Sequence, residues 1–222
     1  TYAFLIFGLT LLSQNSYLDF EIIDHDISTS LVIANDIFKG YLPYERVWDD
    51  KQPLFYFFNY VILFFSGKNF IYYKIIFDIF IFVNALLILK IISKRFRMKK
   101  TTGLISSVTY LAFMSLPWAN AEYSETMSLS FLGLAYYGLL GGSSKKTANL
   151  TWGIFIGIST LINIGSSIFL IGFFVLVILQ NKKHIIQKGI YLFFGFTFVH
   201  STVILIYFSQ SLLDIYLLTL FK

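Results

Sequence analysis

Long runs without a charged residue dominate this chain of 222 residues. They cover residues 1–18, 52–67, 101–121, 126–144, 147–181 and 189–213. A further stretch, Phe70–Leu89, is apolar except for Lys74 and Asp78, which are four residues apart and share one face of a helix. A helix needs roughly 20 mostly apolar residues to cross the hydrocarbon layer of a membrane. The runs therefore predict an all-α protein that crosses a membrane several times.

The composition excludes a soluble domain. Hydrophobic residues make up 57% of the sequence and charged residues only 13%, whereas soluble domains carry about a quarter charged residues. The absence of cysteine excludes disulfides, zinc–thiolate sites and thiol nucleophiles. A formal charge of +5 would favour nucleic-acid binding only if the basic residues formed one face of the protein. Here the basic residues lie in loops. We expect an integral membrane protein surrounded by lipid, with no nucleic-acid partner.

The charges of the loops decide how many spans to count. The run 52–67 is short for a span, and the run 147–181 is long enough for two. If the first lies in the membrane interface and the second breaks near Asn163–Gly165, three loops with eleven basic residues and no acid fall on one side. The positive-inside rule makes that side cytoplasmic. These basic residues are Lys90, Lys94, Arg95, Arg97, Lys99, Lys100, Lys145, Lys146, Lys182, Lys183 and Lys188. The sequence thus predicts about seven spans in a single transmembrane domain, residues 1–222.

Acidic residues gather on the exterior side in this arrangement. Eleven of the twelve acids fall there, and the twelfth is Asp78. Acidic residues contribute little to the orientation of a membrane protein. Their clustering on one side therefore points to a functional role. The chain also begins at Thr1 inside an apolar run and ends at Lys222 directly after a Leu-rich segment. We therefore expect the N-terminal part of a longer protein.

The first exterior loop, residues 19–67, is predicted to form a shelf on the membrane surface. Ser28 or Ser30 is expected to cap an amphipathic helix that ends at Gly40. A second interfacial helix is expected after Pro53. Aromatic residues that suit the headgroup layer lie along this loop, namely Tyr44, Trp48, Phe55, Tyr56 and Tyr60.

A string of spaced residues in this loop resembles a known family. The string comprises Asp24, Asp26, Gly40, Tyr44, Trp48, Asp49, Lys51, Pro53 and Leu54. It resembles the first exterior loop of the polyprenyl-phosphate-sugar-dependent glycosyltransferases, the GT-C-fold enzymes related to protein mannosyltransferases and lipid A aminoarabinose transferases. The spacing to Gly40 gives Asp26, rather than Asp24, the position of the family's catalytic aspartate. Glu122 and Glu125 resemble the acids of the second exterior loop, and spacing favours Glu125.

Three positions depart from the family pattern. Ile27 stands where relatives carry a second acid, and Gln52 replaces one proline of the K-P-P-L motif. Asn163 stands where many relatives carry a lysine, after Gly153 and Gly157 in the G-x-x-x-G helix. The second acid and one cationic contact to phosphate are therefore missing from their usual places.

The resemblance implies transfer of a sugar, with inversion, from a polyprenyl-phosphate donor to a hydroxyl of a glycan, lipid or protein acceptor. Such a hexosyl- or pentosyltransferase would work at the exterior face of a bacterial inner membrane, on a cell-envelope glycan such as lipopolysaccharide. The reaction needs a carboxylate that takes the hydroxyl proton and a cation that stabilises the leaving phosphate. Asp26, with Asp24 beside it, is the candidate base, and Lys51 and Arg46 are the candidate phosphate ligands. The candidate substrate-binding residues are Glu122, Glu125, Tyr44, Trp48 and Asp49.

Each of these residues also has a purely structural interpretation. Asp26 could cap a helix, Arg46 and Lys51 could contact lipid headgroups, and Glu122 and Glu125 could be solvated loop acids. Asp49 and Asp50 could be solvated or paired with Arg46.

Metal binding and transport are the remaining functional alternatives. His25 between two aspartates offers too few ligands for a metal site, so no metal site is assigned. No cofactor is certain, and a divalent cation bound to the acids remains an alternative. The alternative function is a multi-pass transporter or flippase of lipid-linked or polar substrates. It would use ionisable residues near the bilayer midplane on broken helices, such as Lys74, Asp78 and the break at Asn163–Gly165.

Overall fold

The structure, a computed structural model, describes residues 2–14, 25–116, 123–142, 145–180 and 185–220. Every regular element in these ranges is a helix, which confirms the all-α prediction. In chain order the elements are α1 (Tyr2–Ser13), α2 (His25–Phe38), α3 (Pro53–Phe65), α4 (Phe70–Lys90) with a π-helical extension (Ile91–Arg95), α5 (Lys100–Met114), α6 (Ser124–Leu140), α7 (Lys146–Ile162), a 3₁₀ helix (Ile164–Ile168), α8 (Phe169–Gln180), α9 (Ile185–Ser209) and α10 (Leu213–Leu220).

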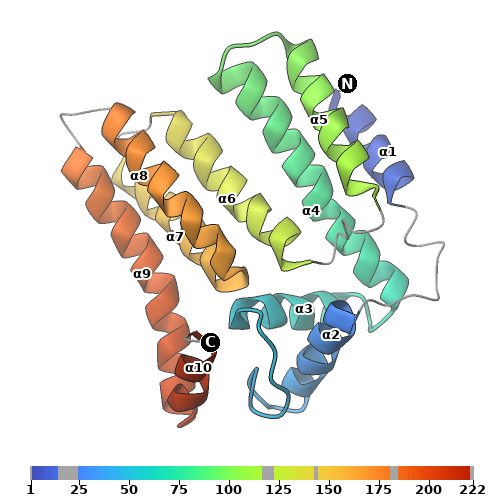
Figure 1. The fold of residues 1–222 in the computed structure, drawn as a ribbon, viewed down its shortest axis with the longest axis vertical. Coiled ribbons are helices and arrows are strands. Elements are labelled where there is room, and N and C mark those ends of the chain that lie inside the picture. The colour runs from blue at the N-terminus through green and yellow to red at the C-terminus, as the bar shows by residue number, and fades with distance from the viewer. Residues whose placement is uncertain (1, 15–24, 117–122, 143–144, 181–184, 221–222) are drawn as a thin grey trace.

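The long helices form a bundle in two groups (Figure 1). Helix α4 packs with α1 and α5, and α6 joins this group to α7, α8 and α9. Helices α2 and α3 lie across one end of the bundle, and α10 lies beside the last turns of α9 at that same end. The two crosswise helices correspond to the interfacial helices that the sequence predicts for the first exterior loop.

Among the residues that the structure describes, two segments have the length and hydropathy of a membrane span. They are Phe70–Arg95, with 26 residues, and Ile186–Ser209, with 24 residues. The apolar helices Tyr2–Ser13, Pro53–Phe65 and Ile164–Phe173 are shorter. Only 11% of the span in α9 is buried within the protein, so most of its apolar side chains lie on the surface, as expected for contact with lipid. These helices indicate association with a membrane, and the figure of seven spans stays a prediction.

Glycines bring α7 and α9 into close contact. A Cβ atom on Gly153 would lie 2.2 Å from the carbonyl oxygen of Leu192, and one on Gly195 would lie 2.2 Å from that of Leu150. Small residues of this kind let helix backbones approach closely within membranes. One turn after Gly153, Gly157 faces Phe196 and Val199, so the G-x-x-x-G spacing of α7 serves the packing of this helix pair.

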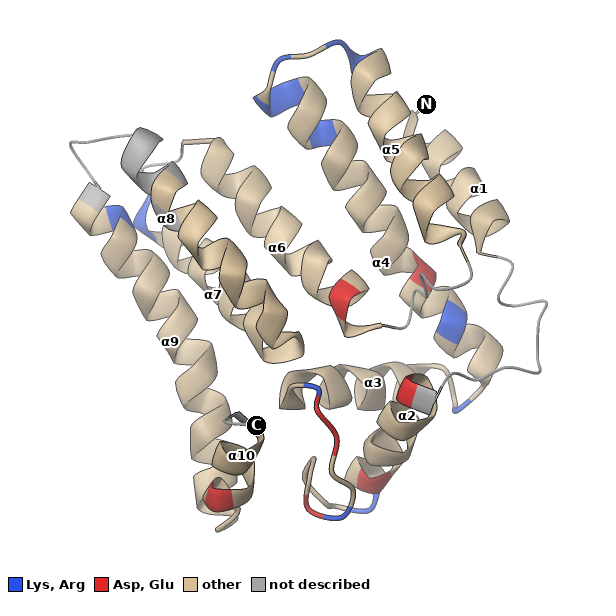
Figure 2. Cartoon of the chain, viewed as in Figure 1, with Lys and Arg blue, Asp and Glu red and all other residues tan. Residues whose placement is uncertain are grey.

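Opposite charges gather at opposite ends of the bundle (Figure 2). Lys and Arg residues lie where α4 ends and where α5, α7 and α9 begin. Acidic residues lie at the other end, on α2, in the loop before α3, at the start of α6 and on α10, where they are mixed with basic residues that include Lys39, Arg46, Lys51 and Lys68. The end that carries α2 and α3 is therefore the acidic end.

The start of α2 differs from the prediction. The helix begins at His25, so neither Ser28 nor Ser30 caps it. The Ser30 hydroxyl instead donates to the carbonyl oxygen of Ile27 at 2.8 Å, one turn back within the same helix. Gly40, in left-handed conformation with φ of 92°, follows the helix as predicted.

Two other predicted boundaries are confirmed. Helix α3 begins at Pro53, which occupies the first helical position because a missing N–H costs nothing there. Helix α7 ends at Ile162, and Asn163 has extended backbone with φ of −144° before the 3₁₀ helix begins. The break near Asn163–Gly165 therefore exists.

Candidate functional site

A sharp turn between α2 and α3 positions the central residue of the site. Tyr44 has a positive φ of 71°, which is uncommon for a residue with a side chain. Its ring is 5% exposed and packs against the rings of Tyr56 and Tyr207. The Tyr44 hydroxyl donates a short hydrogen bond to the carbonyl oxygen of Lys51. Tyr44, predicted to bind substrate, is thus buried beneath Lys51 and holds its backbone.

Lys51 lies among carboxylates from two segments of the chain. Its Nζ is 3.0 Å from Asp50 Oδ1 and 3.7 Å from Asp26 Oδ2 in the first turn of α2. The Lys51 side chain is 22% exposed, whereas that of Asp26 is 55% exposed. The predicted base and one predicted phosphate ligand are therefore in contact, and the base remains open to solvent.

Electrostatics keep Lys51 charged. Burial acts to lower the pKa of Lys51. The hydrogen bond and the charge of Asp50 act in the opposite direction, together with the charges of Asp26 and Glu125, and the net result is a raised pKa of Lys51. Burial also acts against the charged form of Asp50, yet the hydrogen bond and charge of Lys51 leave the pKa of Asp50 lowered. The site therefore holds an ammonium and an ionised Asp50 at neutral pH.

Glu125 belongs to the same cluster from the side of α6. Asn163 Nδ2 donates to Glu125 Oε1 at 2.8 Å and to Ser124 Oγ at 3.0 Å. The charge of Glu125 also acts on Lys51. The break after α7 and the first turn of α6 thus hold a second carboxylate toward the α2–α3 shelf.

Arg46 lies apart from Lys51, so the two predicted phosphate ligands are not brought together. Its Nη1 is 4.0 Å from Asp36 Oδ1, and its guanidinium lies 4.7 Å from the centre of the Tyr41 ring. Asp36 also pairs with Lys39 at 2.8 Å. The alternative in which Arg46 pairs with Asp49 or Asp50 is wrong, because Asp36 is the acid that attracts Arg46 and Asp50 pairs with Lys51.

Asp49 and Trp48 differ in their surroundings. Trp48 is 55% exposed. Asp49 Oδ1 accepts the backbone N–H of Asp50 at 2.8 Å, Oδ2 is buried, and the carboxylate also interacts with the Tyr56 hydroxyl. Burial is the largest influence on Asp49 and raises its pKa. Asp49 is thus a partly buried acid next to the Lys51 cluster.

Three candidates cannot be assigned a place. Asp24, Glu122 and the side chain of His25 lie outside the described residues. Within the described part of the chain, no three His, Cys, Asp or Glu residues come close enough to hold a metal ion.

Sequence reasoning missed two contributors to the cluster. Asp50 was predicted to be solvated or paired with Arg46, although its position next to Lys51 could have signalled the pair with Lys51. Asn163 was predicted to mark a helix break and to replace a lysine, but not to contact an acid. Its place at the helix break, where a side-chain amide can both cap the next turn and reach a neighbour, was the available signal.

No family model, curated protein or solved structure matches this chain. The geometry of the site and the resemblance of residues 24–54 to the glycosyltransferase loop are therefore the basis for assigning a function.

Proposed function

We propose that this protein is an integral membrane glycosyltransferase of GT-C type, which moves a sugar from a polyprenyl-phosphate donor to an acceptor hydroxyl. The observation that carries the proposal is the contact between Lys51 and Asp26, 3.7 Å apart at the acidic end of the bundle. It joins the two chemical groups that the reaction needs most. Asp26 acts as the base that takes the acceptor proton, and Lys51 neutralises the phosphate that leaves.

The location of the cluster fits a donor that is partly lipid and partly water-soluble. The shelf helices α2 and α3 lie across the end of the bundle, and the cluster lies at their junction with α6. A polyprenyl tail would stay among apolar helices while its phosphate and sugar reach the cluster. We propose that the bundle crosses the membrane seven times, with the basic end in the cytoplasm and this cluster at the exterior face.

The remaining polar groups have roles in holding the sugar or the acceptor. Glu125, fixed by Asn163, and the partly buried Asp49 would accept hydrogen bonds from hydroxyl groups. The exposed ring of Trp48 offers an apolar face for a sugar ring. Arg46, held by Asp36, would contact a lipid headgroup rather than the donor phosphate.

Transport is the second candidate function, and one observation favours it. Lys74 and Asp78 are both buried within the long apolar helix α4, where ionisable residues often mark a pathway through a membrane. A flippase or transporter of polar or lipid-linked substrates would use such residues.

The two functions are distinguished by the product. Full-length protein in sealed vesicles is supplied with polyprenyl-phosphate sugars that are radiolabelled in the sugar. A transferase moves the label onto an acceptor and releases polyprenyl phosphate. A transporter carries the intact donor to the other leaflet without breaking the glycosidic bond, and this outcome would overturn the proposal.

A further inference from the structure

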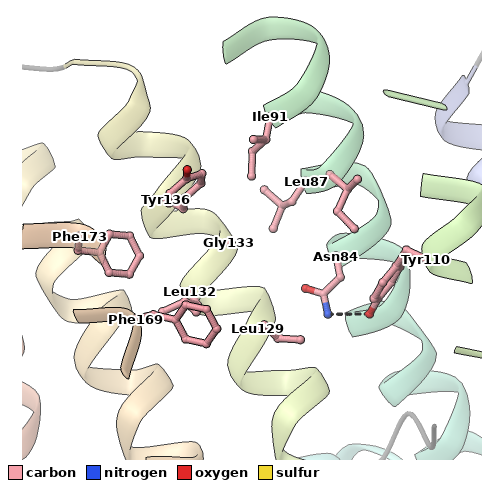
Figure 3. Close-up of a pocket in the computed structure, with 11 residues that line it drawn as sticks. Asn84, Leu87, Ile91, Tyr110, Leu129, Leu132, Gly133, Tyr136, Phe169 and Phe173 are labelled. Atoms are coloured by element: carbon pink, nitrogen blue, oxygen red, sulfur yellow. Dashed lines mark hydrogen bonds between the residues drawn. The ribbon is translucent and has the colours of Figure 1, made fainter. Parts of the chain in front are cut away.

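An apolar cavity of about 500 Å³ lies between α4, α6 and α8, away from the Lys51 cluster. Figure 3 shows Leu87 of α4, Ile91 of its π-helical extension, Tyr136 of α6 and the rings of Phe169 and Phe173 of α8 around it. Its volume falls within the range of about 300–1,000 Å³ that is usual for ligand pockets. The lining favours an apolar ligand or an apolar part of a larger one.

One end of the cavity is closed by polar groups that already have partners. Asn84 Nδ2 donates to the carbonyl oxygen of Thr126 at 2.9 Å and to the Tyr110 hydroxyl at 3.2 Å (Figure 3). The Ser130 hydroxyl donates to Asn84 Oδ1 at 2.9 Å. Because these bonds already satisfy the Asn84 side chain, it is a poor partner for a polar ligand. The end of the cavity at Asn84 therefore suits the tip of a hydrocarbon chain.

The other end of the cavity leads to a positive charge. Ile91 begins the π-helical turn that ends at Arg95. Arg95 Nε donates to the carbonyl oxygen of Tyr137 at 3.1 Å, and its guanidinium lies 4.3 Å from the centre of the Tyr137 ring. Tyr137 directly follows the lining residue Tyr136. Among the described residues, no carboxylate forms an ion pair with Arg95.

The cavity and the charge together define a ligand with two parts. Asn84 and Arg95 are separated by about 16 Å along the helix, at roughly 1.5 Å per residue. An apolar chain of that reach would run from Asn84 to the basic end, where its anionic head would meet Arg95. Basic pockets between helices at the cytoplasmic side of a membrane suit anionic lipid headgroups.

We propose that this cavity binds one acyl chain of an anionic phospholipid from the cytoplasmic leaflet, with its phosphate on Arg95. The proposal depends on the membrane orientation given above and not on sugar transfer. The guanidinium supplies a planar pair of donors for the phosphate. Leu87, Leu132 and the two phenylalanines supply the contacts for the chain.

Native mass spectrometry of the full-length protein tests this directly. Phosphatidylglycerol and phosphatidylcholine with identical acyl chains serve as probes. Arg95→Gln removes the headgroup contact, and Lys94→Gln, on the same exposed turn, removes an equal charge as its control. Gly133→Leu fills the cavity, because a Cβ there already lies 3.0 Å from Leu87 Cδ1, and Gly172→Leu is its control, because nothing lies within 4 Å of a Cβ at that position.

The wild type is expected to retain one phosphatidylglycerol in preference to phosphatidylcholine. Arg95→Gln is expected to weaken retention about tenfold, the effect of losing one hydrogen bond to a charged group, and Gly133→Leu to abolish it, while both controls retain the lipid. If Gly133→Leu does not fold, Ile91→Trp blocks the cavity from its other end. Equal retention of both lipids, retention unchanged in Arg95→Gln and Gly133→Leu, or displacement of phosphatidylglycerol by polyprenyl phosphate would each overturn the proposal. Because no sugar donor is present, failure here is separate from failure of the transferase proposal.

Discussion

The side chain of Asn163 connects a helix break to a carboxylate. Its amide donates to Glu125 Oε1 at 2.8 Å and to Ser124 Oγ at 3.0 Å, while its Oδ1 accepts the backbone N–H of Gly165 at 2.8 Å. The same residue therefore caps the 3₁₀ helix after α7 and orients the acid at the start of α6. We infer that the break serves the cluster around Lys51.

Replacing Asn163 should affect both stability and transfer. Asn163→Ala removes a cap and a hydrogen bond to a carboxylate, so we expect a loss of about 1–2 kcal/mol in the free energy of unfolding. We also expect slower transfer, because Glu125 is no longer held toward Lys51. Asn69→Ala is the matched control, since it removes the cap of α4 far from Glu125. Equal transfer rates in the two variants would contradict the role of Asn163.

Tyr44→Phe should weaken the turn that carries Lys51. The hydroxyl donates to the carbonyl oxygen of Lys51, and its loss should lower the free energy of unfolding by about 0.5–1.5 kcal/mol. Transfer should slow as well, because the ammonium loses its fixed position. Tyr41→Phe serves as the control, since Tyr41 contacts Arg46 through its ring alone. If Tyr44→Phe matched the wild type in both unfolding free energy and transfer rate, the Tyr44 hydroxyl would not be what positions Lys51.

The charges of Asp49 and Asp50 should have opposite effects on stability at neutral pH. The folded pKa of Asp50 is lowered, so its charge contributes stability at neutral pH that is lost as the pH falls through that folded value. The folded pKa of Asp49 is raised, so its charge costs stability at neutral pH, and protonation relieves the cost. Asp50→Asn should therefore destabilise the protein at neutral pH, and Asp49→Asn should stabilise it.

The Asp49→Asn difference should vanish as the pH falls from the raised folded pKa of Asp49 to 3.8, the ordinary value for an aspartate, and the Asp50→Asn difference should vanish as the pH falls further from 3.8 to the lowered folded pKa of Asp50. Urea unfolding of the detergent-solubilised protein across this range measures them. Effects of the same sign in the two variants would show that Asp49 and Asp50 do not lie in the different surroundings described above.

The contact between α7 and α9 makes a prediction about stability alone. Gly153→Ala places a methyl group 2.2 Å from the carbonyl oxygen of Leu192, so the helices must move apart, at a cost of about 1–3 kcal/mol. Gly189→Ala, in α9, meets nothing within 4 Å and should leave stability unchanged or raise it by up to about 1 kcal/mol. Thermal unfolding of the two variants compares them. A neutral Gly153→Ala would contradict the close packing.

The sequence predicted the features that depend on local chemistry. Hydropathy predicted the helices, Pro53 marked the start of α3, and the loop charges predicted the break near Asn163. The start of α2 was misplaced, because Ser28 and Ser30 are also tolerated inside a helix when their hydroxyls bond to the preceding turn.

Contacts between distant segments were harder to predict. The string that resembles the glycosyltransferase family gave Lys51 and Asp26 related roles, and they do lie together. Arg46 could not be separated from Lys51 by sequence, because its partner Asp36 lies ten residues earlier on α2 and depends on how the loop folds back. The apolar cavity depends on the spacing of α4, α6 and α8, which no local pattern records.

Sugar transfer by Asp26→Asn tests the central claim most directly. The full-length protein in membranes is supplied with radiolabelled polyprenyl-phosphate sugars, and the initial rate of label transfer is compared at equal abundance of inserted protein. Asp214→Asn, which changes an exposed acid of α10 outside the cluster, is the control. We predict that Asp26→Asn lowers the rate by about 10²–10⁴-fold, the usual contribution of a general base, while the control stays at the wild-type rate. Transfer by Asp26→Asn at the wild-type rate would contradict the assignment of Asp26 as the base.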